Sequence, residues 1–271
     1  MITNLHIGYN GRLGNQIFQF AAIFGIAKLN GYGFFLPITN TRPAQSNTMD
    51  GKPCVFRLEL ADCFDLDQLL KEPAGITQMA TERHFHYDES ITRIPDGTTL
   101  NGYFQTDRYF SHCKQELVDV LKFKDSVKAA AKEALPDNGK KLVSLHVRRG
   151  DYLHPNPHHP LIGLDYFDEA IKHFEGDEYH FVVFSDDTTW CRDTWGEDPR
   201  FTVIETGSNF IDLCAMSMCD HNIITNSSFS WWGSYLNRNV EKKVIAPKKW
   251  FGPGYADYDL SDLYADFMTI I

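Results

Sequence analysis

An apolar run that ends in a dense polar cluster is the feature that most constrains how this chain can fold. Residues 142–145 read Leu-Val-Ser-Leu, and residues 146–151 continue as His-Val-Arg-Arg-Gly-Asp. A short apolar run between polar segments predicts a buried strand. In an open α/β sheet, ligands bind outside the carboxyl ends of the strands. Because guanidinium groups form rigid donor forks that match phosphate oxygens, Arg148 and Arg149 predict a phosphate site at the end of this strand.

Strands and helices alternate along the C-terminal half of the sequence. Short apolar runs indicate the strands, and apolar residues at helical spacing indicate the helices. Such alternation predicts a parallel sheet with right-handed crossovers. We expect strands at residues 142–147, 180–185, 202–204, 222–225 and 244–246, and helices at residues 165–174, 211–219 and 229–236.

The N-terminal half is less regular. It opens with an expected strand at residues 2–8 and a helix at residues 15–30, after which prolines interrupt residues 32–100. An expected strand at residues 99–105 and helices at 107–123 and 125–135 follow. The Pro-Asp-Asn-Gly break at residues 136–139 predicts the boundary between an N-terminal domain, residues 1–138, and a C-terminal domain, residues 139–271.

Polar clusters follow three of the predicted strands. They are residues 148–151, the two aspartates at 186–187, and Asn-Ser-Ser-Phe-Ser at 226–230. All three would lie at the same edge of a parallel sheet. Their guanidinium, carboxylate and hydroxyl groups suit a diphosphate, a base or ribose, and phosphate oxygens. The third cluster also opens a helix, whose free N–H groups favour an anion.

Composition limits the partners and the compartment. A net charge of −10 argues against nucleic acid as the main partner, so the Arg pair indicates a local pocket. The six cysteines are scattered without a CxxC pair, which is typical of a reducing compartment. No apolar stretch approaches the ~20 residues that span a bilayer. We therefore expect a cytoplasmic protein without a transmembrane segment, and peripheral attachment at the inner face of a membrane stays open.

Several motifs occur in one order along the chain and together resemble a known family. The resemblance is to bacterial α-1,2-fucosyltransferases of glycosyltransferase family 11, which are related to α-1,6- and protein O-fucosyltransferases. The hexapeptide at residues 146–151 is similar to the HxRRxD signature of all three groups. The other matching segments are Gly-Arg-Leu-Gly-Asn-Gln at residues 11–16, Gly-Tyr-Phe-Gln at 102–105, Phe-Ser-Asp-Asp at 184–187, Asn-Ser-Ser-Phe-Ser-Trp-Trp-Gly at 226–233 and Pro-Lys-Lys-Trp at 247–250.

This resemblance implies a fold and an activity. The fold would be α/β and GT-B-like, with two Rossmann-type domains facing a cleft. The enzyme would move L-fucose from GDP-β-L-fucose, bound mainly by the C-terminal half, to the 2-hydroxyl of a galactose-terminated oligosaccharide, with inversion at the sugar. Two other classes stay open: an inverting transferase of another linkage or GDP-sugar donor, and a non-catalytic nucleotide-sugar or glycan-binding module.

The resemblance also implies roles for individual residues. Arg148 would hold the β-phosphate and stabilise the GDP leaving group, and His146 would help to bind the nucleotide. Asp186 or Asp187 would accept hydrogen bonds from the guanine edge. Asn15 would reach the phosphate or the sugar from the N-terminal half. The remaining candidates for nucleotide binding are Arg12, Gly14, Arg149, Asn226, Ser227, Ser228, Phe229 and Ser230.

Neither a cofactor nor a metal is expected. Cations fixed beside a developing negative charge are a large catalytic contribution, so an enzyme with Arg148 at the phosphate need not use a metal. Asp-x-Asp occurs at residues 65–67 and 257–259, where short acidic pairs on a surface are common. The histidines at 154, 158 and 159 form a weak candidate for zinc, because no Cys or second His cluster lies nearby in sequence.

Some roles stay open. Arg149 binds phosphate or forms a structural ion pair, and Asp151 orients an arginine or acts as a base. An imidazole has a suitable pKa for a general base, so His154 joins Asp151 among the catalytic candidates. The glutamate that α-1,6 enzymes carry after this motif falls on Asn156 here. The general base is therefore unassigned. Trp231 and Trp232 are expected in the core.

Overall fold

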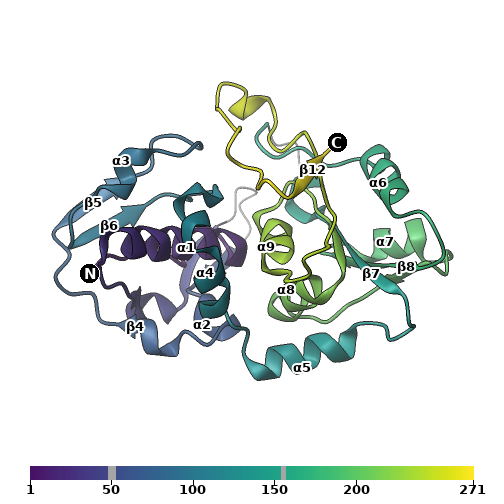
Figure 1. Cartoon of the computed structure of the whole chain (residues 1–271), viewed down its shortest axis with the longest axis horizontal. Coiled ribbons are helices and arrows are strands. Elements are labelled where there is room, and N and C mark those ends of the chain that lie inside the picture. Colours follow the sequence, from purple (N-terminus) through teal and green to yellow (C-terminus); the bar gives the residue numbers. More distant parts are fainter. Residues whose placement is uncertain (48–52, 154–156) are drawn as a thin grey trace. The chain divides into compact units, whose positions relative to one another are not determined.

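The computed structural model describes residues 1–47, 53–153 and 157–271 (Figure 1). The chain divides into two compact units. Unit 1 comprises Met1–Lys124 with Asp257–Ala265, and unit 2 comprises Asp125–Ala256 with Asp266–Ile271. Residues 125–138, which we predicted in the N-terminal domain, group with unit 2 because the helix α5 (Asp125–Ala134) packs against α8 (Asn209–Met218).

Unit 2 is built on a six-stranded parallel sheet. Its strands lie in the order β12-β11-β10-β7-β8-β9. This is the order of a doubly wound dinucleotide-binding sheet, in which the first strand is central and the order reverses beside it. The strands are β7 (Lys141–Val147), β8 (Tyr179–Ser185), β9 (Phe201–Val203), β10 (His221–Ile223), β11 (Val244–Ala246) and β12 (Met268–Ile270).

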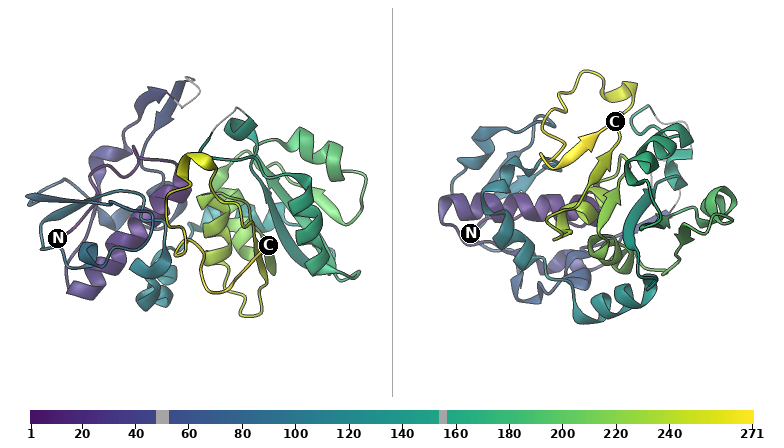
Figure 2. Two further views of the ribbon diagram at one scale, coloured as in Figure 1. Left: turned by 90° about the horizontal axis from the view of Figure 1, so that it is seen from above. Right: turned by 45° about the vertical axis from the view of Figure 1, so that its right-hand side comes forward.

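Helices cover both faces of this sheet (Figures 1 and 2). On one face, α6 (Leu164–Ile171) and α7 (Thr188–Trp195) bring Phe167 and Trp195 into an apolar core with Val143 and Val183. Neighbouring residues of a strand point to opposite faces. Ser144 accordingly lies on the other face, where the side-chain amide of Asn222 donates to its Oγ at 2.7 Å and to a carbonyl of α8 at 2.9 Å. The helix α9 (Ser228–Leu236) packs beside α8.

The predicted alternation in the C-terminal half is confirmed, with the predicted strands at the positions of β7 to β11. Two elements escaped prediction. The helix α7 is short and carries polar residues on most of its surface, so its apolar periodicity is weak. The strand β12 is paired on one side only and is exposed at two of its three residues, so it lacks the continuous apolar run of a central strand.

Unit 1 is more fragmented. The 18-residue helix α1 (Leu13–Asn30) is almost entirely buried, and the strands of this unit form three two-stranded sheets. Parallel bridges join Ile2 to Phe34 and Thr3 to Thr99 in place of the predicted long strand at residues 2–8. The remaining strands and helices are β1 (Leu36–Pro37), β2 (Ala44–Asn47), β3 (Pro53–Phe56), α2 (Leu60–Cys63), β4 (Leu70–Lys71), β5 (Gln78–Thr81), α3 (Glu89–Thr92), β6 (Thr98–Asn101) and α4 (Lys114–Val120). Among the helices in the described ranges, none is long and apolar enough to cross a membrane.

Candidate active site

The three predicted polar clusters follow three adjacent strands of unit 2. The strand β7 lies between β8 and β10, with Val147 beside Ser185 and Leu145 beside Ile223. The clusters that start at residues 148, 186 and 226 therefore leave the same edge of the sheet. The strand order reverses between β7 and β10, and a doubly wound sheet binds its nucleotide at such a switch point.

Arg148 is held between two carboxylates. Its Nη1 lies 2.7 Å from Asp186 Oδ2, and its Nη2 pairs with Asp151. The Arg148 side chain is 22% exposed and Asp151 is 50% exposed, so the Asp151 pair borders solvent. Asp186 also accepts the backbone N–H of Arg149 at 2.9 Å. Of the two roles left open for Asp151, orientation of an arginine is the one that matches its contact.

Gly150 is required where the Arg148 loop passes Asp186. A Cβ placed on Gly150 would overlap Asp186 Oδ2 and lie 3.2 Å from its Cγ. The glycine therefore lets the backbone after β7 approach the carboxylate that follows β8. This close approach fixes the position of the Asp186 carboxylate beside Arg148.

Arg149 forms the structural contacts that were one of its two predicted alternatives. Its Nε donates to Asp187 Oδ2 at 3.0 Å, and its guanidinium lies 4.1 Å from the centre of the Trp190 ring. Asp187 in turn caps α7 by accepting the backbone N–H of Trp190 at 3.1 Å. The bond from Arg149 lowers the pKa of Asp187 below its usual value.

His146, the penultimate residue of β7, is a neutral, buried imidazole. It is 6% exposed, and its Nδ1 lies 2.9 Å from Thr225 Oγ1 on the neighbouring segment after β10. Burial lowers the pKa of His146 to about 4; the Asp186 charge opposes this shift. His146 therefore spans the switch point as an uncharged hydrogen-bonding group.

The segment after β10 leads into α9 and is held by several hydrogen bonds. The Asn226 side-chain amide donates to the carbonyls of Pro160 (2.9 Å) and Trp250 (3.1 Å), and its buried Oδ1 finds no partner among the described residues. Ser227 caps α9 by accepting the N–H of Phe229. Ser230 accepts the N–H of Thr225 at 3.3 Å. Ser228 is the first residue of the helix. A helix N-terminus carries partial positive charge and suits an anion.

The sequence of this chain matches a known family at full length. Residues 2–253 match the model described as Glycosyl transferase family 11. The chain belongs to this family. The predicted family resemblance is thereby confirmed.

Three relatives of this family 11 chain cover it to different extents. The O-antigen biosynthesis glycosyltransferase WbnK of Escherichia coli is 42% identical over 118 residues, 40% of this chain and 39% of that protein. The galactoside 2-alpha-L-fucosyltransferase SEC1 of Bos taurus is 27% identical over 250 residues, 85% of this chain and 63% of that protein. The matches thus span less than two thirds of both relatives. The alpha-1,2-colitosyltransferase of Escherichia coli is 34% identical over 268 residues, 89% of this chain and 90% of that protein.

The fold is that of a solved structure of remote sequence. The crystal structure of POFUT1 in complex with GDP matches with a TM-score of 0.51 and 11% identity, over 91% of this chain and 97% of that chain. At this identity the likeness concerns the fold alone. The predicted GT-B-like α/β fold is confirmed.

The predicted residues of the N-terminal motif form a cluster of their own in unit 1. Arg12 occupies the N-cap position of α1, Gly14 is buried in its first turn, and Asn15 follows. Asn15 Oδ1 accepts a hydrogen bond from Gln105 Nε2 at 2.9 Å. Gly11, with a φ of 89°, passes so close to Asn15 that a Cβ there would overlap its side chain.

Two residues that contact the candidate site, Tyr152 and Trp190, were not predicted from the sequence. One residue that was predicted lies outside the described ranges. Tyr152 packs its ring 5.5 Å from the Arg148 guanidinium and donates from its hydroxyl to the Asn226 carbonyl at 3.3 Å; burial raises its pKa to about 12. The ring of Trp190 packs against the guanidinium of Arg149. Tyr152 directly follows the motif, and Trp190 stands three residues after Asp187, but neither spacing identifies a site. His154 lies outside the described residues.

The other histidines of the predicted cluster pack among aromatic rings. His159 stacks on Tyr152 with the ring centres 5.2 Å apart, and His158 lies 4.5 Å from the ring of Tyr255. Within residues 1–47, 53–153 and 157–271, no group of three or more His, Cys, Asp or Glu side chains could hold a metal ion. Trp231 and Trp232 are fully buried, which confirms their predicted place in the core.

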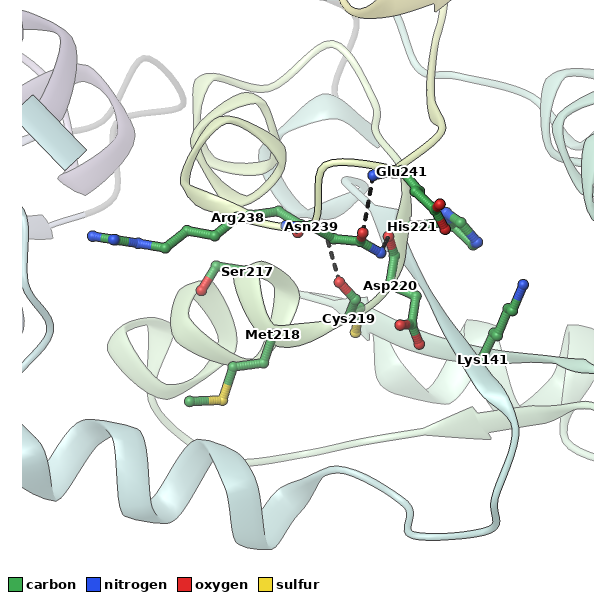
Figure 3. A pocket seen from close by; sticks show the side chains of 10 residues that line it. Lys141, Ser217, Met218, Cys219, Asp220, His221, Arg238, Asn239 and Glu241 are labelled. Carbon is green, nitrogen blue, oxygen red and sulfur yellow. Dashed lines mark hydrogen bonds between the residues drawn. The ribbon is translucent and has the colours of Figure 1, made fainter. Parts of the chain in front are cut away.

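A hollow of about 380 Å³ lies at the opposite, amino edge of the same sheet (Figure 3). Lys141 begins β7 and His221 begins β10, so this hollow is remote from the cluster after the carboxyl ends. Asn239 joins its walls: its side-chain amide donates to the Asp220 carbonyl, and its side-chain oxygen accepts the N–H of Glu241. None of the residues that line this hollow belongs to the motif clusters.

Proposed function

We propose that this chain is an inverting galactoside α-1,2-fucosyltransferase. It transfers L-fucose from GDP-β-L-fucose to the 2-hydroxyl of a terminal galactoside, without a metal or another cofactor. The observation that carries the proposal is Arg148 at the switch point of a doubly wound sheet in a family 11 chain. The names of two relatives, a galactoside 2-alpha-L-fucosyltransferase and an alpha-1,2-colitosyltransferase, support the linkage.

The reaction explains why an arginine is needed there. The acceptor hydroxyl attacks C1 of fucose, and the bond from C1 to the β-phosphate oxygen breaks. Its electron pair leaves with GDP, the hydroxyl proton passes to a base, and the configuration inverts from β to α. One well-placed donor at such a developing charge contributes ~2.7–4 kcal/mol. Arg148 is held in advance by Asp186, and its half-exposed partner Asp151 is the contact that a phosphate replaces.

The remaining predicted residues complete the donor site. His146 and the entry to α9, residues 226–230, line the nucleotide and its diphosphate, and Asp186 or Asp187 meets the guanine edge. Arg12, Gly14 and Asn15 of unit 1 are the further candidates for donor binding. The enzyme works in the cytoplasm.

A second donor is favoured by one observation. The alpha-1,2-colitosyltransferase matches this chain at 34% identity over 89% of its length. An α-1,2 transferase that uses the GDP derivative of colitose is therefore the alternative activity.

The test is a transfer assay with the purified chain. GDP-fucose and the GDP derivative of colitose are each incubated with lactose and with N-acetyllactosamine, and the linkage of the product is determined by NMR. We expect fucose on the 2-hydroxyl of galactose, and a loss of more than ~100-fold in Arg148→Ala. Preferred transfer of colitose would replace the donor assignment. Turnover near that of the wild type in Arg148→Ala would remove Arg148 from the mechanism.

A further inference from the structure

Glu82 binds two consecutive backbone amides of a loop in unit 1. It follows β5, and its carboxylate reaches the loop after β6. Its Oε2 accepts the N–H of Tyr103 at 2.7 Å, and its Oε1 accepts the N–H of Phe104 at 2.8 Å. Both oxygens of the carboxylate thus hold one short stretch of backbone. These amides belong to the Gly-Tyr-Phe-Gln segment at residues 102–105, whose function the donor site does not explain.

The loop adopts a conformation that needs such support. Phe104 has a φ of 55°, in the left-handed region that L residues other than Asn and Asp rarely adopt. Its side chain is fully buried beside Tyr109, with the ring centres 5.5 Å apart. Gly102 passes so close that a Cβ there would lie 2.7 Å from Glu82 Oε2. The buried ring and the carboxylate together hold the backbone in this turn.

The next residue, Gln105, links the loop to Asn15. Gln105 Nε2 donates to Asn15 Oδ1 at 2.9 Å. Because this bond engages Oδ1, it sets which way the Asn15 amide faces, and its Nδ2 is left as the donor for a ligand. A shift of the loop would release Gln105 and allow the Asn15 amide to rotate.

We propose that Glu82 is a positioning residue of the sugar-transfer reaction, which holds the loop at residues 102–105 so that Gln105 fixes the orientation of Asn15. The proposal rests on the proposed role of Asn15 in binding the donor. Glu82 acts through the loop and not on the substrate.

The charge of Glu82 determines whether it can hold both amides. Protonation turns one oxygen into an O–H group, which is a donor and a weaker acceptor, so the bonds that the carboxyl accepts from the two amides weaken. Burial raises the pKa of Glu82 to about 7, and the two amide bonds oppose this shift. Burial raises the pKa of Tyr109, whose hydroxyl accepts the N–H of Asp88, and the Glu82 charge adds to this shift. These two amide bonds, the Glu82 clamp, are therefore at full strength well above pH 7 and weaken as the pH falls through 7.

The first test compares Glu82→Gln with the wild type. Glutamine keeps the shape of the side chain but presents an NH₂ group to one of the two amides. We expect kcat to fall by about tenfold or more at alkaline pH, because a small misplacement of a site residue is costly. The acidic limb of the pH profile near 7 should also disappear. The matched control is Glu89→Gln, which alters an exposed glutamate of α3 paired with Arg93 and should leave both readouts unchanged.

A double-mutant cycle with Gln105→Ala separates positioning from a general structural effect. If Glu82 acts through Gln105, adding Glu82→Gln to Gln105→Ala changes kcat by less than about twofold. Effects that multiply would overturn the proposal, as would wild-type kcat and an unchanged acidic limb in Glu82→Gln.

Hydrogen exchange of the backbone amides tests the Glu82 clamp independently of transfer activity. The peptide that contains Tyr103 and Phe104 should exchange faster in Glu82→Gln than in the wild type above pH 7, and the ratio of the two rates should approach one below it. This result together with no transfer by the wild type would refute the proposed function but not the clamp. Equal exchange rates at all pH values would refute the clamp itself.

Discussion

Replacement of Gly150 by alanine tests how Arg148 is held. The added Cβ would overlap Asp186 Oδ2, so that the carboxylate must move by about 1 Å to reach an ordinary contact distance. Asp186 makes two contacts there: an ion pair with Arg148, whose Nη1 lies 2.7 Å from Asp186 Oδ2, and a hydrogen bond that it accepts from the Arg149 N–H at 2.9 Å. Displacement of the carboxylate away from Gly150 disturbs both contacts, because charge-assisted contacts are strong only at short distance.

The expected loss of activity follows from the strength of these two contacts. A hydrogen bond to a charged group contributes about 1.5–3 kcal/mol to stability. Asp186 is 28% exposed, so water replaces part of that contribution. We expect a net cost of about 1–3 kcal/mol in transition-state binding, which is about a 5- to 150-fold loss of kcat/KM.

The assay is steady-state transfer with GDP-fucose and lactose, with thermal unfolding measured on the same samples. The matched control is Gly139→Ala, also in unit 2. Its Cβ would meet nothing within 4 Å, but its φ of 73° strains an alanine by about 1 kcal/mol. The control should therefore lower the melting temperature and keep kcat/KM. A kcat/KM for Gly150→Ala within about twofold of the wild type would refute the claim that Asp186 must hold Arg148 in place.

Three further predictions concern pH, metal and packing. Burial lowers the pKa of His146 to about 4, so its contribution to stability is present above the unfolded pKa of ~6.5 and is lost as the pH falls towards 4. Urea unfolding should lose up to about 3 kcal/mol across that window, less so in His146→Gln; equal losses would contradict this. Transfer should persist in EDTA, and loss of activity that Mg²⁺ or Mn²⁺ restores would contradict a metal-free mechanism. Trp231→Ala should lower the free energy of unfolding by about 3–5 kcal/mol in the same assay, and a change below about 1 kcal/mol would contradict its place in the core.

The gathering of the three polar clusters at one sheet edge was predictable because it depends on local order along the chain. Each of the three strands that the clusters follow is a short apolar run with polar residues directly after it. Parallel pairing brings those polar residues to one edge, whichever strands are neighbours.

Contacts between segments far apart in sequence could not be predicted in the same way. The ion pair of Arg148 with Asp186 joins the ends of two strands, and the close approach of Gly150 appears only once that carboxylate is in place. Glu82 stands in an unremarkable stretch, more than twenty residues before Phe104, whose amide it accepts. The unit boundary was placed at the Pro-Asp-Asn-Gly break, whereas the packing of α5 on α8 moves it to residue 125.

Calorimetric titration of the purified chain with GDP, with ADP and UDP as controls, tests the nucleotide site most directly. We expect GDP to bind, ADP and UDP to bind far more weakly, and GDP binding to be lost in Arg148→Ala. Equal affinity for the three nucleotides would contradict a guanine-reading site. Wild-type affinity for GDP in Arg148→Ala would contradict the central claim that Arg148 holds the diphosphate.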